Sequence, residues 1–339
     1  MNNDVKLDTH ISLAHGNGGR FMRELIDEIF SKYLSNDDLD VQADAASLKI
    51  EKTDIMFTTD GFTVQPLEFP GGNIGSLAVH GTTNDLAVSG AIPKYLSLNA
   101  FIEEGMEVKQ LERIVKSLAR SANEVGVKIV AGDTKVLPRG QGGGLYLATT
   151  GIGIRDNDLN LSLANIKNKD VMLLSGSVGD HGISVMLARE QFGLSGKVVS
   201  DSASVLAYTQ ALSGLEGVHF MRDPTRGGLA TVCHEISRFT KMGIRLQQDK
   251  IPVKDPVQSV CEMLGYDPLF LACEGRVVAV VNEVCAEEAL SRWKALPDGQ
   301  DAIIFGELDE NITRVVLMTE FGGERILEEL EDDPLPRIC

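Results

Sequence analysis

Segments of strand type and of helix type alternate along most of this chain. Helical periodicity occupies 21–34, 74–89 and 107–125, and apolar runs typical of strands occupy 47–51, 55–59, 95–101, 145–154 and 171–174. Such alternation is typical of α/β or α+β proteins, in which helices cover a sheet. At 339 residues the chain is long enough for two domains with separate cores.

A polar stretch between about residue 160 and Asp170 separates two such units. We therefore expect four parts: an N-terminal segment with a glycine loop and a helix (1–35), an N-terminal domain (36–158), a C-terminal α/β domain (165–325) and a mobile tail (326–339). In the second half, Asp223-Pro224 is expected to open a helix as its N-cap and first residue. A last helix is expected over 324–331.

Charge and cysteine content exclude several classes of protein. The chain has 32 basic and 49 acidic residues, a net charge of −17, which argues against binding to nucleic acid. No apolar stretch approaches the ~18 residues of a membrane span and the N-terminus does not resemble a signal peptide, so we expect a cytoplasmic protein. Five cysteines without a C-x-x-C pair argue against a disulfide framework or a zinc site. Cys233, Cys273 and Cys285 lie in apolar runs and are expected in the core.

The last residue, Cys339, ends a tail that contains two prolines, Asp332-Asp333-Pro334-Leu335-Pro336-Arg337-Ile338-Cys339. In polyproline conformation, at about 3.1 Å per residue, eight residues reach roughly 25 Å. A thiol on such an arm is suited to act as a carried nucleophile. The alternative is a frayed terminus that happens to end in cysteine.

Four aspartates follow strand-like runs or lie beside small residues. They are Asp44, Asp60, Asp85 and Asp133. Taken singly, each is more often a turn or helix cap. Carboxylates that converge on one site repel unless they share cations, and with Mg²⁺ they form a clamp for a polyphosphate. The set therefore indicates a metal–nucleotide site.

Glycine-rich loops supply further candidates for anion binding. His15-Gly16-Asn17-Gly18-Gly19 precedes the first helix and could cradle anionic oxygens with its backbone N–H groups. The glycines at 140–144 are a plausible lid after Lys135. The loop at 175–182 follows a strand, but it matches neither a P-loop nor a dinucleotide-binding fingerprint.

These motifs, in this order, resemble the PurM-like ATP-dependent superfamily, which includes aminoimidazole ribonucleotide synthetase, selenophosphate synthetase and thiamine-monophosphate kinase. The motifs are His15–Gly19, Thr59–Gly61, Asn84–Ala87, Gly132–Thr134 and Asp223–Leu229. The terminal Pro336-Arg337-Ile338-Cys339 resembles one branch, the HypE family of hydrogenase maturation factors. The N-terminal glycine loop lacks the reactive Cys or selenocysteine of selenophosphate synthetases, which counts against that branch.

The resemblance implies a PurM-like fold of two α/β domains. Its N-terminal domains would pair into a dimeric β-barrel with ATP near the interface, and its C-terminal domain would be an α/β sandwich followed by the tail. It also implies site residues. Asp44, Asp60, Asp85 and Asp133 would hold Mg²⁺ and the triphosphate, and Asn84, Thr134, Gly18 and Gly19 would bind the nucleotide. The role of Asp223 stays open between this site and a helix cap.

The resemblance further implies an activity. HypF would supply a carbamoyl group to Cys339, ATP would drive its dehydration to a thiocyanate, and a HypC–HypD complex would take the cyanide for the iron of [NiFe]-hydrogenase. Glu274 would act as the base, and Lys135 would stabilise the anionic oxygen or the γ-phosphate. From the residues alone, a carboxylate in the position of Glu274 is more often a salt-bridged loop residue, and Lys135 is likewise compatible with a solvated loop lysine.

Two alternatives remain at this point. One is another PurM-like kinase or ligase that acts on a free small molecule, in which the terminal cysteine is idle. The other is a noncatalytic carrier or scaffold with a structural nucleotide. Prenylation is a poor explanation because Cys339 does not lie in a C-a-a-X sequence.

Overall fold

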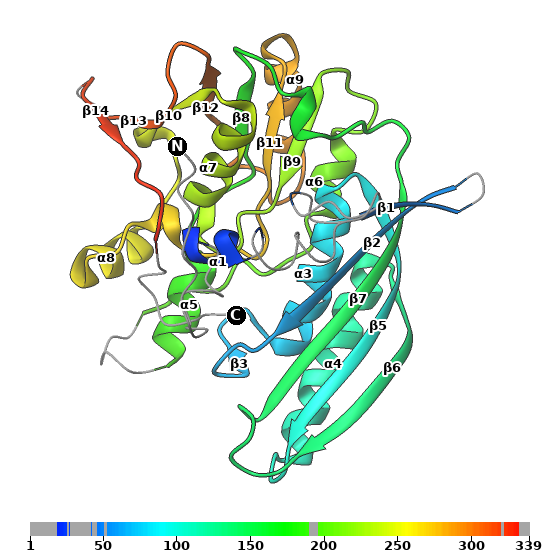
Figure 1. The fold of residues 1–339 in the computed structure, drawn as a ribbon. Coiled ribbons are helices and arrows are strands. Elements are labelled where there is room, and N and C mark those ends of the chain that lie inside the picture. The colour runs from blue at the N-terminus through cyan, green and yellow to red at the C-terminus, as the bar shows by residue number, and fades with distance from the viewer. Residues whose placement is uncertain are drawn as a thin grey trace.

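The computed structural model describes residues 19–25, 27, 42, 46–50, 53–189, 196–319 and 322–331. The predicted site residues Gly18, Asp44 and Cys339 lie outside this part of the chain. The helices are α1 (Arg20–Leu25), α3 (Ile74–Val88), α4 (Val108–Val125), α5 (Asp180–Ala188), α6 (Leu206–Ala211), α7 (Gly228–Thr240), α8 (Asp255–Leu264) and α9 (Ala286–Lys294). Figure 1 shows two sheets, each lined by helices.

A five-stranded sheet forms the N-terminal half, in the order β1-β2-β7-β5-β6. Its strands are β1 (Ala46–Ile50), β2 (Thr53–Phe62), β5 (Ala91–Glu103), β6 (Lys128–Leu137) and β7 (Leu145–Arg155). Helices α3 and α4 cover one face (Figure 1). Because side chains alternate along a strand, Met56, Thr58 and Phe62 of β2 are buried under α3, whereas Phe57 and Thr59 point outward and are exposed.

A seven-stranded mixed sheet forms the C-terminal half, in the order β14-β13-β10-β12-β8-β11-β9. Its strands are β8 (Val171–Leu174), β9 (Val218–Arg222), β10 (Gly243–Gln247), β11 (Val278–Val281), β12 (Ile303–Asp309), β13 (Val315–Met318) and β14 (Glu324–Ile326). Helix α7 packs on one face beside Met172 and Leu174, and α9 packs on the other beside Leu173. Because both faces are covered, the inner strands β8 and β11 are continuous apolar runs.

The two halves share a hydrophobic cluster. Ile183 of α5 and Val260 of α8 pack in the same cluster as Leu77 of α3 and Ile114 of α4. Helix α3 is buried on nearly its whole surface, because it lies between its own sheet and the C-terminal half. It starts at a capping box, in which the Asn73 side chain accepts from the backbone of Ser76 and the Ser76 hydroxyl accepts from the backbone of Asn73. A small hairpin, β3 (Glu68–Phe69) with β4 (Gly72–Asn73), leads into it.

The mixed α/β architecture predicted from the sequence is confirmed. Cys233, Cys273 and Cys285 are buried as expected, together with Cys261. In the described part of the chain, no helix is both long enough and apolar enough to cross a membrane.

The expected helix start at Asp223-Pro224 is wrong. Helix α7 begins at Gly228, after Gly227 in left-handed conformation with φ of 72°. Gly228 also has positive φ, and a Cβ there would lie 2.6 Å from the carbonyl oxygens of Leu269 and Leu271. The paired glycines thus allow the close approach of another chain segment, and they move the helix start five residues beyond Asp223.

The expected helix over 324–331 is also wrong. Residues Glu324–Ile326 form strand β14, which pairs antiparallel with β13, and the backbone N–H of Leu327 donates to the carbonyl of Val315. Arg245 of β10 holds Glu324 by an ion pair of 2.5 Å. These contacts come from residues distant in sequence, so the local helical pattern did not reveal them.

Candidate active site

A pocket lies where β2 and α3 of the N-terminal half meet two loops of the C-terminal half. Its lining is polar and contains four carboxylates. The lining residues are Thr58, Thr59, Asp60, Gly61, Phe62, Gly81, Asp85, Asp223, Thr225, Arg226 and Glu274. The fold therefore brings together three sequence-predicted site residues, Asp60, Asp85 and Glu274, and adds Asp223.

Asp60 and Asp85 reach the pocket from neighbouring elements. Asp60 lies near the end of β2 and accepts from the backbone N–H of Gly61 at 2.7 Å. Asp85 lies on α3 and accepts from the Thr58 hydroxyl at 3.0 Å. Helix α3 approaches β2 closely at Gly81, where a Cβ would lie 2.8 Å from the Phe62 ring. This approach places both carboxylates on one wall.

Asp223 and Glu274 form the opposite wall and are both buried. The pKa of Asp223 is raised to about 6, mainly by burial, with the charge of Arg222 acting against the shift and that of Asp60 adding to it. Burial also raises the pKa of Glu274 well above its usual range, with smaller contributions from Asp223 and Asp201. Arg226 lowers the pKa of Glu274 and lies 4.0 Å from Asp60. The carboxylates thus repel one another in a pocket where Asp223 and Glu274 are shielded from water.

The carboxylates of this pocket suit a cation that takes only some of its ligands from the protein. Within the described residues, no group of three or more His, Cys, Asp or Glu side chains is arranged to hold a metal alone. Mg²⁺ usually keeps waters and phosphate oxygens among its ligands and takes one or two carboxylates. Asp60 and Asp85 on one wall fit that demand, and positive charge beside them would relieve the repulsion in the pocket.

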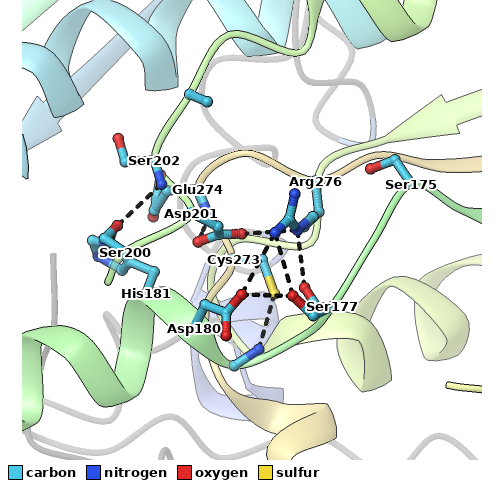
Figure 2. Close-up of polar contacts among 12 residues, drawn as sticks. Ser175, Ser177, Asp180, His181, Ser200, Asp201, Ser202, Cys273, Glu274 and Arg276 are labelled. Carbon is cyan, nitrogen blue, oxygen red and sulfur yellow. Dashed lines mark hydrogen bonds and ion pairs between the residues drawn. The ribbon is translucent and has the colours of Figure 1, made fainter. Parts of the chain in front are cut away.

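A buried ion network holds the loop that carries Glu274 (Figure 2). Arg276 lies between two aspartates: its Nε is 3.4 Å from Asp201 Oδ2, and its Nη2 is 3.5 Å from Asp180 Oδ2. The same Nε donates to the Ser177 carbonyl. Asp201 in turn accepts from the backbone N–H of Glu274 at 3.2 Å. No sequence motif had indicated a role for Asp180, Asp201 or Arg276. The only signal was the nearness of Arg276 to Glu274 in the sequence.

Asn84 lies beside the pocket but does not line it. Its side chain is buried at the contact between α3 and the loop at 203–205, where it bonds to backbone groups of the C-terminal half. Gly19, from the predicted glycine loop, packs against the backbone of Leu330 and Glu331, and Arg20 donates its N–H to Leu330. The start of α1 therefore lies beside the residues that lead into the tail.

Asp133, Thr134 and Lys135 lie apart from this pocket on β6. Register partners connect Asp60 through Thr149 and Leu98 to Gly132, so Asp133 is three strands away, about 14 Å at ~4.8 Å per strand. Asp133 and Lys135 form an ion pair of 2.9 Å with side chains 59% and 63% exposed. That pair and the Thr134 N–H lower the pKa of Asp133. A single copy of the chain therefore does not bring Asp133, Thr134 or Lys135 to Glu274.

Family models match both halves of the chain. The model described as "AIR synthase related protein, N-terminal domain" matches residues 42–155, and "AIR synthase related protein, C-terminal domain" matches residues 167–315. Together they cover well over half of the sequence.

Curated relatives match nearly the whole length. The chain is 42% identical over 331 residues to "Carbamoyl dehydratase HypE" of Azotobacter vinelandii, with 97% of each chain covered. It is 42% identical over 335 residues to "Carbamoyl dehydratase HypE" of Escherichia coli K12, covering 97% of this chain and 99% of the relative.

Solved structures of HypE proteins match the fold over most of the chain. A crystal structure of a HypE–HypF complex gives a TM-score of 0.85 at 44% identity, covering 90% of this chain and 99% of the other. A HypE protein crystallised in complex with ATP gives a TM-score of 0.80 at 40% identity, covering 97% of this chain and all of the other (100%).

Proposed function

The chain belongs to the HypE family of carbamoyl dehydratases, and we propose that its substrate is a carbamoyl group carried on its own Cys339. One observation carries this proposal: Glu274 is 4% exposed in a pocket that it shares with Asp60 and Asp85. A buried carboxylate beside a metal–phosphate site suits a reaction in which protons leave a group that is being phosphorylated. The similarity to relatives named carbamoyl dehydratases supports the same reaction class.

The proposed reaction conserves atoms as follows. The oxygen of the thiocarbamate, S–C(=O)–NH₂, takes the γ-phosphoryl group of ATP, which releases ADP. The N–H protons are then removed, the C–O bond breaks and phosphate leaves with the former carbamoyl oxygen. The product on the cysteine is S–C≡N. In formal terms one water is transferred to the phosphoryl group.

Glu274 is the proposed base for the N–H protons. Its pKa is raised well above the usual range, mainly by burial, so its ionised form is a stronger base than an exposed carboxylate. Arg226 opposes that shift and stabilises the ionised form. Asp223, on the same wall, is placed to share or accept the proton.

Asp60 and Asp85, with Asp44, are the proposed ligands of Mg²⁺. When bound with ATP, the ion would supply positive charge to the phosphate oxygens. ATP binding is supported by the ATP complex of a HypE protein of the same fold. The protein's own part is to orient these carboxylates through Thr58 and Gly61.

We propose that a second copy of the chain covers the outer face of the N-terminal sheet. This face exposes large apolar side chains, Phe57, Tyr95, Phe101 and Ile154, which register places on the side away from α3. Asp133 and Lys135 pair with Asn99 and Phe101 and so lie on the same face. The proposed roles of Asp133 and Lys135 therefore belong at the interface of a homodimer, whereas Thr134 pairs with Ala100 and its side chain lies on the opposite, helix-covered face. Apolar faces of this kind mark sites of protein association.

HypF is the proposed carbamoyl donor, which the HypE–HypF complex of a close structural neighbour supports. A HypC–HypD complex is the proposed acceptor of the cyanide, which would become a ligand of the [NiFe]-hydrogenase iron. In the proposed sequence of steps Cys339 meets HypF and HypC–HypD away from the pocket and ATP within it, and eight residues beyond Glu331 span roughly 25 Å in extended form.

The test is the intact mass of the protein after incubation with a HypF carbamoylation system and then with MgATP. We expect a gain of one carbamoyl group followed by loss of one water, and neither in Cys339→Ala. If ATP hydrolysis with a small-molecule acceptor is unchanged in Cys339→Ala and no adduct forms on the wild type, a free-substrate kinase or ligase is the better explanation.

A further inference from the structure

We propose that Asn84 is a positioning residue that holds Glu274 in register with the metal-binding carboxylates across the boundary between the two halves. This inference rests on the proposed role of Glu274 as the base. It assigns to Asn84 a task different from nucleotide binding.

The Asn84 amide bonds to two segments of the C-terminal half, the loop at 203–205 and the peptide of Glu274. Its Nδ2 donates to the carbonyl of Ala203 at 3.0 Å and to the carbonyl of Glu274 itself at 3.3 Å. Its Oδ1 accepts from the N–H of Val205 at 2.9 Å. The side chain is 1% exposed and does not line the pocket. Its donor and acceptor both have backbone partners in the C-terminal half.

Both backbone polar groups of Glu274, its N–H and its carbonyl, are hydrogen-bonded. Its N–H donates to Asp201, and its carbonyl accepts from Asn84 and from the N–H of Ala203 at 3.3 Å. The next residue must be glycine, because a Cβ at Gly275 would lie 1.9 Å from the carbonyl oxygen of Asp201. A side chain on a peptide held in this way has few directions open to it.

Three residues hold the Glu274 peptide: Asp201, Ala203 and Asn84. Of these, Asn84 alone comes from the N-terminal half. Its neighbour on α3, Asp85, lines the pocket, so one turn of helix both presents a metal-binding carboxylate and holds the base. Asp201 comes from the C-terminal half, on the same side of the boundary as Glu274. Loss of the Asn84 amide would therefore loosen the base relative to Asp60 and Asp85 without removing any of the three.

The experiment compares four proteins: Asn84→Ala, Glu274→Gln, the double variant and Thr83→Val. Thr83 is the matched control, because it is the preceding residue of α3, is equally buried and bonds through its hydroxyl to the carbonyls of Val79 and His80 in the same helix. Each protein is carbamoylated on Cys339. The rate of water loss after mixing with MgATP is followed by mass in a single turnover, and ATP affinity is measured separately by calorimetry.

We expect Asn84→Ala to slow water loss by about 10- to 100-fold, the cost of misplacing a reacting group by about 1 Å, with ATP affinity unchanged. Thr83→Val should react at the wild-type rate. In the Glu274→Gln background, Asn84→Ala should cause no further loss, because a residue that acts through Glu274 has nothing left to position.

Three results overturn the proposal, and they differ from failure of the proposed base. Weaker ATP binding with an unchanged rate makes Asn84 a nucleotide ligand. Equal losses in Asn84→Ala and Thr83→Val, or a further loss in the double variant, make Asn84 merely structural. A Glu274→Gln protein that reacts at the wild-type rate removes the base itself and the positioning proposal with it.

Discussion

The pocket around Glu274 and the outer face around Lys135 carry similar charged side chains in opposite surroundings. Glu274 is 4% exposed, its peptide is held by Asp201 and Asn84, and burial raises its pKa well above the usual range. Lys135 is 63% exposed and pairs with Asp133 on an edge strand. Water and salt therefore screen the charges of Lys135 and Asp133, whereas the buried Glu274 carboxyl is screened much less. The proposed chemistry of one chain therefore centres on Glu274, whereas the proposed role of Lys135 depends on what covers the sheet.

The largest effect should come from removing the base. Glu274→Gln keeps the shape of the side chain but cannot accept a proton, so water loss from carbamoylated Cys339 should slow by about 10²- to 10⁴-fold. The measurement is the single-turnover mass assay. Carbamoyl transfer from HypF onto Cys339 is the internal control and should be unaffected, since in the proposed reaction it precedes the ATP-dependent step assigned to Glu274. A rate near that of the wild type would place the base elsewhere.

A second prediction concerns the charge buried beside Glu274. The pKa of Asp223 is 3.8 in its ordinary state and about 6 in the folded protein. A raised folded-state pKa favours the protonated form, so this stabilising contribution is complete below pH 3.8 and is lost as the pH rises through about 6. Asp223→Asn should therefore gain stability over the wild type as the pH rises, by about 3 kcal/mol near neutrality.

The measurement is urea unfolding of both proteins in EDTA across this pH range. A difference in the free energy of unfolding that stays constant with pH would contradict the pKa shift. Addition of Mg²⁺ should shrink the difference, because a cation in the pocket favours the ionised wild-type carboxylate.

A third prediction tests whether Lys135 serves the pocket of the partner. Lys135→Ala and Glu274→Gln homodimers should each be impaired. If the two residues act across the interface, mixing and re-forming the dimers restores one intact site in each mixed dimer. Mixed dimers form about half of the population, so about a quarter of the wild-type activity should return. No recovery, with mixed dimers shown by mass, would mean that both residues act within one chain.

Local sequence patterns predicted those parts of the fold that depend on neighbours in the chain. The helix expected over 74–89 is α3 and the one over 107–125 is α4, because their periodicity and burial agree. The patterns failed where distant contacts decide. Residues 324–331 contain a strand because β13 and Arg245 bind it, and α7 starts late because Gly228 lies against Leu269 and Leu271.

The candidate site, like the fold, was predictable where local motifs decide and not where distant contacts decide. Motifs indicated Asp60 and Asp85, and the family resemblance indicated Glu274; the structure brings the three together. They could not separate Asp133 and Lys135 from this group, since that distance follows from the strand order β2-β7-β5-β6. Nor could they reveal Asp201 and Arg276, whose partners are far away in sequence. Asp44, Gly18 and Cys339 lie outside the described residues and remain predictions.

The smallest effect compares the two faces of one strand. Thr58 and Thr59 are adjacent on β2, and Val has the shape of Thr without its hydroxyl. Thr58 is buried and donates to Asp85 at 3.0 Å, so Thr58→Val should destabilise the protein by about 1 kcal/mol, the usual net value of a hydrogen bond. Thr59 is exposed on the outer face, where its hydroxyl bonds to Thr149 and Thr150, and Thr59→Val should change stability by less than about 0.5 kcal/mol because water replaces the lost partner. Chemical unfolding of both variants measures the difference. Equal values would mean that the pocket side of β2 is as accessible to water as the outer side, which would remove the physical reason for assigning the chemistry to the pocket.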